Sequence, residues 1–265
     1  MRNFDGQHFL ENTQILQVIS DQIPPGSEIV EIGAGTGQLT KYLLDRAKEV
    51  TAIEIDPGFQ KELENLKNGH ENLEVITGDA LEYDFSQKAG AWIVGNIPYH
   101  ITESLVTKLT RSKISGAVLL VGESFAREVT ALEAKDLTHF GKLTLTVNAF
   151  FQPRVLQIVG KENFSPPPRT KSVILSLTPR ADIVSLQAFI LRRLLLPARH
   201  NPLIKNALLN ALIVYKTQTK NEARSIISKL NLPREILEKN FEQLNNFQYL
   251  VLYQALKRLP QDVLK

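Results

Sequence analysis

One segment, residues 28–37, limits the possible fold more than any other part of the sequence. The apolar run 28–32 has the composition of a buried strand and leads into the turn Gly33-Ala34-Gly35-Thr36-Gly37, after which a helical pattern begins. A second apolar run, residues 50–56, carries Glu54 19 positions beyond Gly35. Glycines let the backbone approach a ligand closely, and an acidic residue at this distance typically binds a ribose. The segment therefore predicts a Rossmann-like α/β unit that binds a nucleoside-containing cofactor.

The glycine turn by itself would suit either NAD or S-adenosylmethionine (SAM). Two further apolar runs, residues 73–77 and 91–94, also predict strands, and polar side chains follow each of them. The carboxyl ends of parallel strands lie at one edge of an open α/β sheet, where ligands bind. Four polar side chains are therefore expected to converge on one crevice: Glu31, Glu54, Asp79 and Asn96.

The tetrapeptide Asn96-Ile97-Pro98-Tyr99 indicates which chemistry this crevice supports. It places an amide, a main-chain carbonyl and an aromatic ring together at the end of a strand. The amino group of a base needs hydrogen-bond acceptors, and the base needs an aromatic surface on which to stack. A hydride-transfer enzyme has no evident use for this set. The sequence therefore favours an amino-methyltransferase that acts on nucleic acid, with SAM as its cofactor.

Six motifs, in this order along the chain, resemble those of the ribosomal RNA adenine N6-dimethyltransferases. They are Gly6-Gln7-His8-Phe9-Leu10, Glu31-Ile32-Gly33-Ala34-Gly35-Thr36-Gly37, Glu54-Ile55-Asp56, Gly78-Asp79-Ala80, Asn96-Ile97-Pro98-Tyr99 and Asn163-Phe164-Ser165-Pro166-Pro167-Pro168. The late segment Phe241-Glu242-Gln243-Leu244 is similar to that of the small-subunit enzymes. The resemblance covers essentially the whole chain. It implies SAM as methyl donor and two neighbouring adenines near the 3′ end of small-subunit ribosomal RNA as substrate.

The strand ends and the resemblance together give a predicted cofactor site. Glu54 is expected to accept hydrogen bonds from the ribose hydroxyls, and Asp79 from the adenine amino group. Glu31 is expected to reach the methionine amino group only through water, and Asp56 to cap the following helix. By resemblance, residues 7–10 close over the cofactor. The predicted cofactor-binding residues are Gln7, His8, Leu10, Gly33, Gly35, Glu54, Ile55, Asp79, Ala80 and Asn96.

The catalytic hypothesis follows from the electronics of adenine, whose N6 lone pair is delocalised into the ring. Two hydrogen-bond acceptors are needed to favour a more tetrahedral nitrogen, and the Asn96 side-chain oxygen and the Ile97 carbonyl are the candidates. Pro98 restricts the backbone around that carbonyl. Tyr99 is expected to stack on the base and Phe164 to cover its other face. No dedicated general base is required, because the sulfonium methyl group is already activated.

The charge of the chain is unevenly distributed. Residues 1–150 hold 13 Lys/Arg and 21 Asp/Glu, whereas residues 151–265 hold 18 and 7, although the net charge is only +3. A basic second part suggests a polyanionic partner, but solvated helix faces would give the same pattern. There is no cysteine, and the five histidines show no metal-ligand spacing, so no metal is expected. Without a long apolar run or a signal-peptide core, the chain is expected to be cytoplasmic.

Strand and helix patterns alternate up to about residue 123, which predicts a mainly parallel sheet with helices on both faces. Residues 143–151, 155–159 and 172–177 are expected to add late, partly antiparallel strands. Helical spacing then appears in residues 183–196, 203–214, 221–230 and 247–259. The predicted organisation is a SAM-binding catalytic domain, residues 1–180, followed by a small all-helical RNA-binding domain, residues 181–265.

Residues 122–128 replace the more Gln/Lys-rich helix start of the family, and residues 199–205 are less basic than usual, so these changes bear on the RNA-facing surface. In addition, His8 and His100 stand where asparagine is usual. Both can still donate hydrogen bonds, so binding is expected to survive. Two other functions stay open: methylation of a large-subunit adenine, which confers macrolide resistance, and a ribosome-assembly or RNA-binding role with secondary catalysis. The segment 241–244 argues against the first, and the intact motif 96–99 against the second. A monomer that acts on small-subunit ribosomal RNA or a pre-ribosomal particle is expected.

Overall fold

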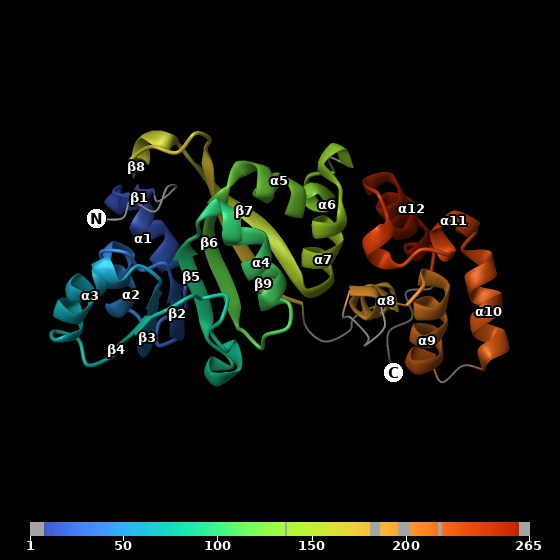
Figure 1. The fold of residues 1–265 in the computed structure, drawn as a ribbon, viewed down its shortest axis with the longest axis horizontal. Helices are drawn as coiled ribbons and strands as arrows, with labels where there is room; N and C mark the ends of the chain where they lie inside the picture. Colours follow the sequence, from blue (N-terminus) through green and yellow to red (C-terminus); the bar gives the residue numbers. More distant parts are fainter. Residues whose placement is uncertain (1–7, 136, 181–185, 196–201, 217–218, 260–265) are drawn as a thin grey trace. The chain divides into compact units, whose positions relative to one another are not determined.

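In the computed structural model, the described residues are 8–135, 137–180, 186–195, 202–216 and 219–259 (Figure 1). The chain divides into two compact units, each with its own hydrophobic core. Unit 1 comprises Met1–Thr130 and Gln152–Pro179, and unit 2 comprises Ala131–Phe151 and Arg180–Lys265. The sequence placed residues 131–151 in the first domain, whereas their contacts join them to the C-terminal helices.

Unit 1 is built on a seven-stranded sheet with the order β4-β3-β2-β5-β6-β9-β7. Its strands are β2 (Glu28–Ile32), β3 (Glu49–Glu54), β4 (Leu73–Thr77), β5 (Trp92–Asn96), β6 (Gly116–Gly122), β7 (Phe151–Val159) and β9 (Ser172–Pro179). Strands β2 to β6 pair in parallel, and β9 pairs antiparallel with β6. The prediction of a mainly parallel sheet with a late antiparallel strand is confirmed. A separate antiparallel ribbon joins β1 (Phe9–Leu10) to β8 (Phe164–Ser165).

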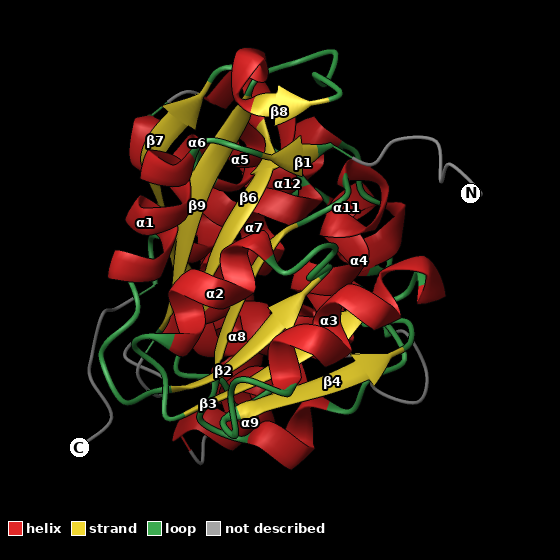
Figure 2. Ribbon diagram, turned by 90° about the vertical axis from the view of Figure 1, so that its left-hand side faces the viewer, coloured by secondary structure: helices red, strands yellow, loops and turns green. Residues whose placement is uncertain are grey.

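Helices cover the sheet of unit 1 on both sides. They are α1 (Thr13–Asp21), α2 (Gln38–Leu44), α3 (Gln60–Lys67), α4 (Tyr99–Leu109) and α5 (Glu123–Val129). In Figure 1, α1 and α2 lie to one side of the strands and α4 lies on the other, and Figure 2 shows the yellow strands flanked by red helices. Helix α1 begins where it does because the Asn12 side chain accepts from the backbone N–H groups of Gln14 and Ile15 in the first turn.

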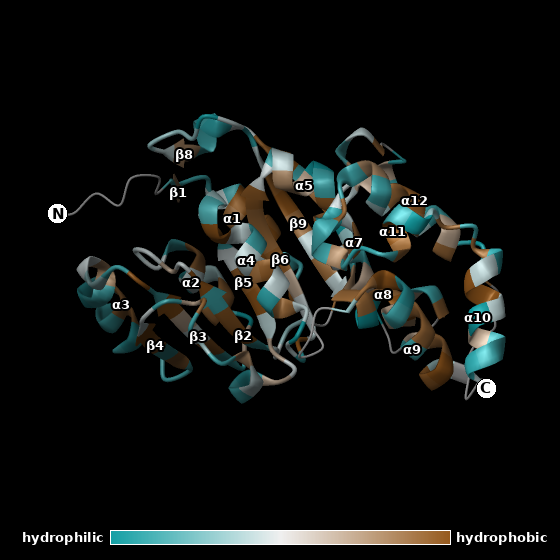
Figure 3. Ribbon diagram, turned by 45° about the vertical axis from the view of Figure 1, so that its right-hand side comes forward, coloured by the Kyte–Doolittle hydropathy of each residue, from teal (hydrophilic) through white to brown (hydrophobic). Residues whose placement is uncertain are grey.

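The centre of the sheet is apolar on both faces, as a covered parallel sheet requires. All seven residues of β6 are buried, and Figure 3 shows hydrophobic colouring along β6 and β9. Strands β2 and β5 approach each other closely at Gly95. A Cβ atom at Gly95 would lie 2.3 Å from the carbonyl oxygen of Ile32 and 2.9 Å from Cδ1 of Ile97. Only glycine therefore fits where β5 passes the end of β2.

Unit 2 is helical in its described part. It contains α6 (Ala131–Ala134), α7 (Lys142–Phe150), α8 (Leu186–Leu195), α9 (Ile204–Lys216), α10 (Lys220–Lys229), α11 (Arg234–Leu237) and α12 (Asn246–Leu256). The four helices expected from sequence correspond to α8, α9, α10 and α12. Among the residues described, no helix is long and apolar enough to cross a membrane.

The strand predicted for residues 143–151 is wrong, because this segment forms helix α7. Its alternating Leu and Thr residues suggested a strand, but the helix buries Leu143, Leu145 and Val147, and Thr144 is buried as well. The polar groups are satisfied within the helix: the Thr146 hydroxyl donates to the carbonyl of residue 142, and the Asn148 amide donates to that of residue 144. Burial against α8 and α12 therefore outweighs the local strand preference.

The close approach at Gly95 predicts that Gly95→Ala reduces the free energy of unfolding by about 1 to 3 kcal/mol. The new methyl group would overlap a main-chain oxygen, and β5 cannot move aside because β2 and β6 pair with it on both sides. Urea unfolding followed by circular dichroism measures the loss. Gly78→Ala is the matched control, since a Cβ there meets nothing within 4 Å. Equal stability of the two variants would contradict this packing.

Candidate active site

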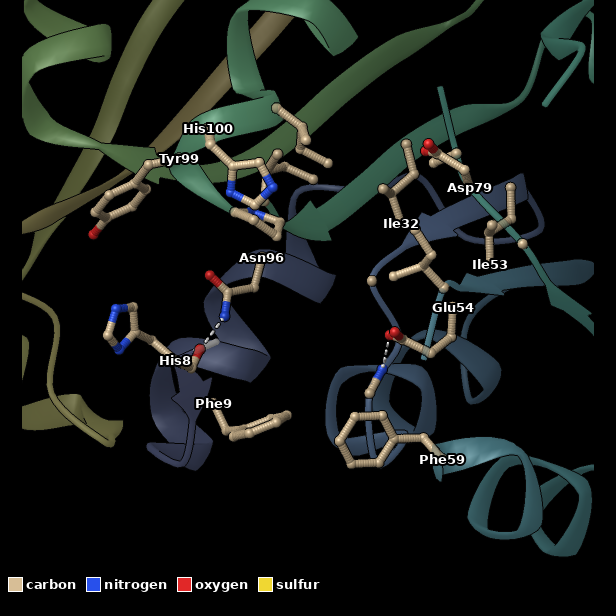
Figure 4. Close-up of a pocket in the computed structure, with 18 of the residues that line it drawn as sticks. His8, Phe9, Ile32, Ile53, Glu54, Phe59, Asp79, Asn96, Tyr99 and His100 are labelled. Carbon is tan, nitrogen blue, oxygen red and sulfur yellow. Dashed lines mark hydrogen bonds between the residues drawn. The ribbon is translucent and has the colours of Figure 1, made fainter. Parts of the chain in front are cut away.

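A cavity of about 370 Å³ lies at the carboxyl ends of β2, β3, β4 and β5 (Figure 4). It sits where the strand order reverses, because β3 and β5 lie on opposite sides of β2. Its volume is in the range of small-molecule and cofactor sites. The lining residues are His8, Phe9, Ile32, Gly33, Gly35, Ile53, Glu54, Ile55, Phe59, Gly78, Asp79, Ala80, Asn96, Ile97, Pro98, Tyr99, His100, Ile101 and Phe164.

Most of the residues singled out from sequence meet in this cavity. The predicted residues that line it are His8, Gly33, Gly35, Glu54, Ile55, Asp79, Ala80, Asn96, Ile97, Pro98, Tyr99 and Phe164. Leu10 does not line it; it is buried and pairs with Phe164 in the β1–β8 ribbon. Glu31 is also buried and does not line it, so the expected convergence holds for three of the four polar groups. Gln7 lies outside the described residues.

Three aromatic side chains line the cavity without having been assigned to the site. Phe9 and Phe59 pack edge to face with ring centroids 5.6 Å apart, and a Cβ at Gly35 would lie 3.3 Å from the Phe9 ring. The glycine turn thus lies against an aromatic pair. Phe9 belongs to a quoted motif and could have been included, whereas no local signal marks Phe59. His100 lines the cavity directly after Tyr99.

Glu54 at the end of β3 holds the glycine turn in place. One carboxylate oxygen accepts from the Gly35 N–H at 2.8 Å, and the other accepts from the Asp56 N–H at 2.9 Å (Figure 4 shows the first bond). Gly33 and Gly35 have φ angles of 72° and 54°, which favour glycine. An ionised carboxylate offers about four acceptor sites, so Glu54 keeps acceptor capacity for a ligand. The capping role predicted for Asp56 is confirmed, because its side chain accepts from the Gly58 N–H.

The end of the cavity beyond Glu54 combines an acidic and an apolar group. The exposed Asp79 carboxylate accepts from the Leu81 N–H at 2.8 Å, which fixes its orientation after β4. The Ile55 side chain is 53% exposed, so it presents an open apolar surface at the end of β3. A planar group that carries hydrogen-bond donors at its edge would match this pairing of surfaces.

The Asn96 amide is oriented by the N-terminal segment. Its Nδ2 donates to the His8 carbonyl at 2.7 Å, so its oxygen points away from His8 and toward the side of Tyr99 (Figure 4). The next residue is fixed by the sheet, because the Ile97 N–H donates to the Leu120 carbonyl at 3.0 Å. Pro98 then starts helix α4 with a φ of −55°. The motif therefore presents a side-chain acceptor at a rigid strand end.

The Tyr99 ring is held from two directions. Its hydroxyl shares a 2.8 Å hydrogen bond with the Ser172 hydroxyl of β9, and its ring lies against Gly122 at the end of β6. The ring is nevertheless 40% exposed, whereas Ser172 is buried. Phe164 is 6% exposed and packs in the core of unit 1 while it lines the cavity. Tyr99 is thus a fixed aromatic surface that stays open to a ligand.

Contacts to the proline-rich loop, residues 163–168, fix the N-terminal segment, residues 8–12, beside the cavity. Phe9 pairs with Ser165 in the β1–β8 ribbon. The His8 ring donates from Nδ1 to the Pro166 carbonyl at 2.8 Å, and the Asn12 amide donates to the Asn163 side-chain oxygen at 2.8 Å. These bonds join residues about 150 positions apart in the sequence. They keep His8 next to Asn96 and Tyr99.

Glu31, at the end of β2 beside the glycine turn, is a buried carboxylate with a raised pKa. Burial raises its pKa from the ordinary 4.5 to about 8; the Thr40 hydroxyl opposes this shift, and the Glu54 carboxylate adds to it. Within the described residues, neither Glu31 Oε2 nor the Thr40 hydroxyl meets hydrogen-bond geometry with a partner. A cation bound beside the glycine turn would therefore favour the ionised form of Glu31.

The fold and the cavity together define a class of protein. The open sheet with this strand order, the glycine turn fixed by a buried acid, and the Asn-Ile-Pro-Tyr strand end are those of a Rossmann-like methyltransferase. Residues 1–248 match the family model described as ribosomal RNA adenine dimethylase. The chain belongs to this family, which confirms the resemblance found in the sequence.

Known relatives agree with this assignment. The chain is 32% identical to the probable ribosomal RNA small subunit methyltransferase A of Methanosarcina mazei, over 90% of this chain and 86% of the relative. It is similar in structure to a dimethyladenosine transferase from Plasmodium falciparum, with a TM-score of 0.64, 27% identity, and coverage of 92% of this chain and 96% of that one. It also shares the fold of the 23S rRNA methyltransferase ErmE, with a TM-score of 0.63, 24% identity, and coverage of 94% and 100%.

The raised pKa of Glu31 makes stability depend on pH. Between pH 4.5 and about 8 the folded protein keeps a proton that the unfolded chain has lost, so this group lowers the free energy of unfolding as pH rises. The slope reaches up to about 1.4 kcal/mol per pH unit. Glu31→Gln removes this dependence, so urea unfolding at pH 5, 6, 7 and 8 should show the variant gaining on the wild type. Glu71→Gln, at an exposed position, serves as the control. A pH-independent difference for Glu31→Gln would refute the assignment.

Proposed function

We propose that this protein uses SAM to dimethylate N6 of two adjacent adenines near the 3′ end of small-subunit ribosomal RNA, during ribosome biogenesis. The observation that carries the proposal is the Asn96 amide, whose NH₂ group is engaged by the His8 carbonyl while its oxygen faces the side of Tyr99. An adenine amino group is the natural donor to such an acceptor. The name of the Methanosarcina mazei relative supports the small-subunit substrate.

The cavity residues fit SAM. The Glu54 carboxylate, buried and fixed by two backbone bonds, would accept from the ribose hydroxyls with its remaining acceptor sites. Ile55 would contact the cofactor adenine, and Asp79 would accept from its amino group. The glycine turn leaves space for the methionine end, and Glu31 lies buried close by. When bound, SAM supplies a methyl group on a positively charged sulfur; the Glu54 and Asp79 carboxylates would complement that charge, and the cation would favour ionisation of Glu31.

Catalysis would rest on positioning and polarisation of the target base. The Asn96 oxygen and the Ile97 carbonyl would accept the two N6 hydrogens and so favour a more nucleophilic nitrogen. Pro98 holds the backbone of the motif. Tyr99 would stack on the extruded base, and Phe164, assigned to the second face from sequence, lines the same cavity. These residues would hold the amino nitrogen at a fixed place in the cavity, and such positioning would contribute to the rate enhancement.

Unit 2 would bind the RNA. The two segments of unit 2, residues 131–151 and 180–265, hold 16 Lys/Arg and 8 Asp/Glu, a net charge of +8, and the described part of unit 2 is a helical scaffold. Binding to RNA phosphates would make affinity fall steeply as salt rises. The protein would act as a cytoplasmic monomer on a pre-ribosomal particle.

The first test is methyl transfer from labelled SAM to purified small-subunit particles that lack native methylation, with large-subunit RNA in parallel. Wild-type protein should label small-subunit adenines, and Asn96→Ala should lose at least about 100-fold in rate, because an electrostatic contact at the reacting atom is removed. SAM affinity of the variant reports whether the cavity persists. Label only on large-subunit RNA would favour the resistance class, and SAM binding without any transfer would favour an assembly role.

The Tyr99–Ser172 hydrogen bond predicts that removing either hydroxyl slows methyl transfer. Ser172→Ala and Tyr99→Phe should each lower kcat/KM for the particle about fivefold, since each removes one hydrogen bond that fixes the stacking surface. The double variant should be no worse than either single variant, because both changes remove the same bond. Ser20→Ala is a matched control: Ser20 is a buried serine whose hydroxyl donates to the Tyr42 carbonyl, away from the cavity. Fully additive losses would show that the bond has no positioning role.

A further inference from the structure

We propose that His8 forms the second wall of the slot that receives the target base, opposite Tyr99. This inference rests on the proposed function, because it concerns how the same cavity holds adenine. It gives His8 a role in substrate recognition, whereas its motif predicted a place in the cofactor site. Four observations lead to it.

The first observation concerns which face of Tyr99 is available. A Cβ at Gly122 would lie 3.4, 3.5 and 3.5 Å from three carbons of the Tyr99 ring, which places the main chain of β6 over one face of the ring. The Ser172 hydroxyl holds the far end of the ring. The ring is still 40% exposed, so its other face is the one a base can use.

The second observation is the distance between the two rings. The centroids of His8 and Tyr99 are 6.5 Å apart, and their planes are tilted by 41°. Stacked bases lie about 3.4 Å apart, so a base between two rings needs about 7 Å. The centroid separation is close to this value, and the tilt makes the space between the two rings a wedge rather than a parallel slot, a geometry that aromatic contacts tolerate. Figure 4 shows both rings on the same side of Asn96, with the amide oxygen directed toward that side.

The third observation is that the His8 ring is fixed in place. Its Nδ1–H donates to the Pro166 carbonyl at 2.8 Å, and the main-chain carbonyl of the same residue accepts from Asn96 Nδ2 at 2.7 Å. One residue therefore sets the orientation of the catalytic amide and carries an aromatic ring beside it. A fixed ring loses little conformational freedom when it contacts a base. The asparagine usual at this position in the family has no ring with which to form such a wall.

The fourth observation concerns Phe164, the other candidate for the second wall. Its side chain is 6% exposed and packs in the core of unit 1 with Leu10 and other apolar residues. Little of its ring face is free to stack. His8 is only partly buried. The structure thus assigns the stacking contact to His8 and leaves Phe164 as a mostly buried residue of the cavity lining.

The test compares His8→Ala, His8→Phe, His8→Asn and Phe164→Leu in methyl transfer to unmethylated small-subunit particles, with SAM affinity from calorimetry. Loss of one stacking contact should lower kcat/KM for the particle about 10- to 100-fold in His8→Ala and His8→Asn. SAM affinity should stay within about twofold, and His8→Phe should return kcat/KM to within about threefold of the wild type. His70→Ala is the matched control, since its Nδ1 also donates to a main-chain carbonyl, that of Leu66, outside the cavity.

A second readout does not depend on transfer: fluorescence of a single-stranded RNA that carries 2-aminopurine, an adenine isomer quenched by stacking. Wild-type protein and His8→Phe should quench it, and His8→Ala should quench it less. A loss of SAM affinity equal to the loss of transfer, a His8→Phe variant as defective as His8→Ala, or a loss confined to Phe164→Leu would each overturn the inference. Wild-type protein that quenches 2-aminopurine through His8 but transfers no methyl group to the particle would contradict the proposed substrate. The same result would support His8 as a wall of the base-binding slot.

Discussion

The hydrogen bond from the Asn96 amide to the His8 carbonyl joins the two parts of the molecule on which the site depends. Asn96 ends β5, a strand in the middle of the sheet, and its backbone pairs with Leu120 of β6. His8 belongs to a segment held by the proline-rich loop. An amide alone can turn either end toward a ligand, but here its donor end is engaged. The acceptor end is therefore committed to the cavity before any base arrives.

The charges around the cavity suit a cationic cofactor and a neutral base. Glu54 is buried and ordered by two backbone N–H groups, and Glu31, which burial keeps protonated up to about pH 8, would ionise more readily beside a bound cation. Tyr99 and the Asn96 oxygen, farther along the cavity, carry no charge. The acidic end is matched to a sulfonium, and the uncharged end to an adenine ring. The basic excess lies in residues 151–265, where it would attract RNA phosphates.

Local sequence patterns predicted an element correctly where burial of a continuous apolar run was enough to fix its secondary structure. The strands 28–32 and 73–77 were placed to the residue, because a covered parallel strand needs a continuous apolar run. Helix α7 was missed, because an apolar segment of this length fits either a strand or a buried helix until its neighbours are known. Its partners, α8 and α12, come later in the chain. The short helix α11 was missed as well.

The sequence by itself determined the fold class, the family and most of the residues that line the cavity, because glycine turns, strand-end acids and the motif 96–99 act through the local backbone. The tertiary structure alone decided that Glu31 is buried away from the cavity, that Phe9 and Phe59 lie against the glycine turn, and that His8 faces Tyr99. These arrangements depend on contacts between segments as far apart as residues 8 and 166, and no local pattern encodes such contacts.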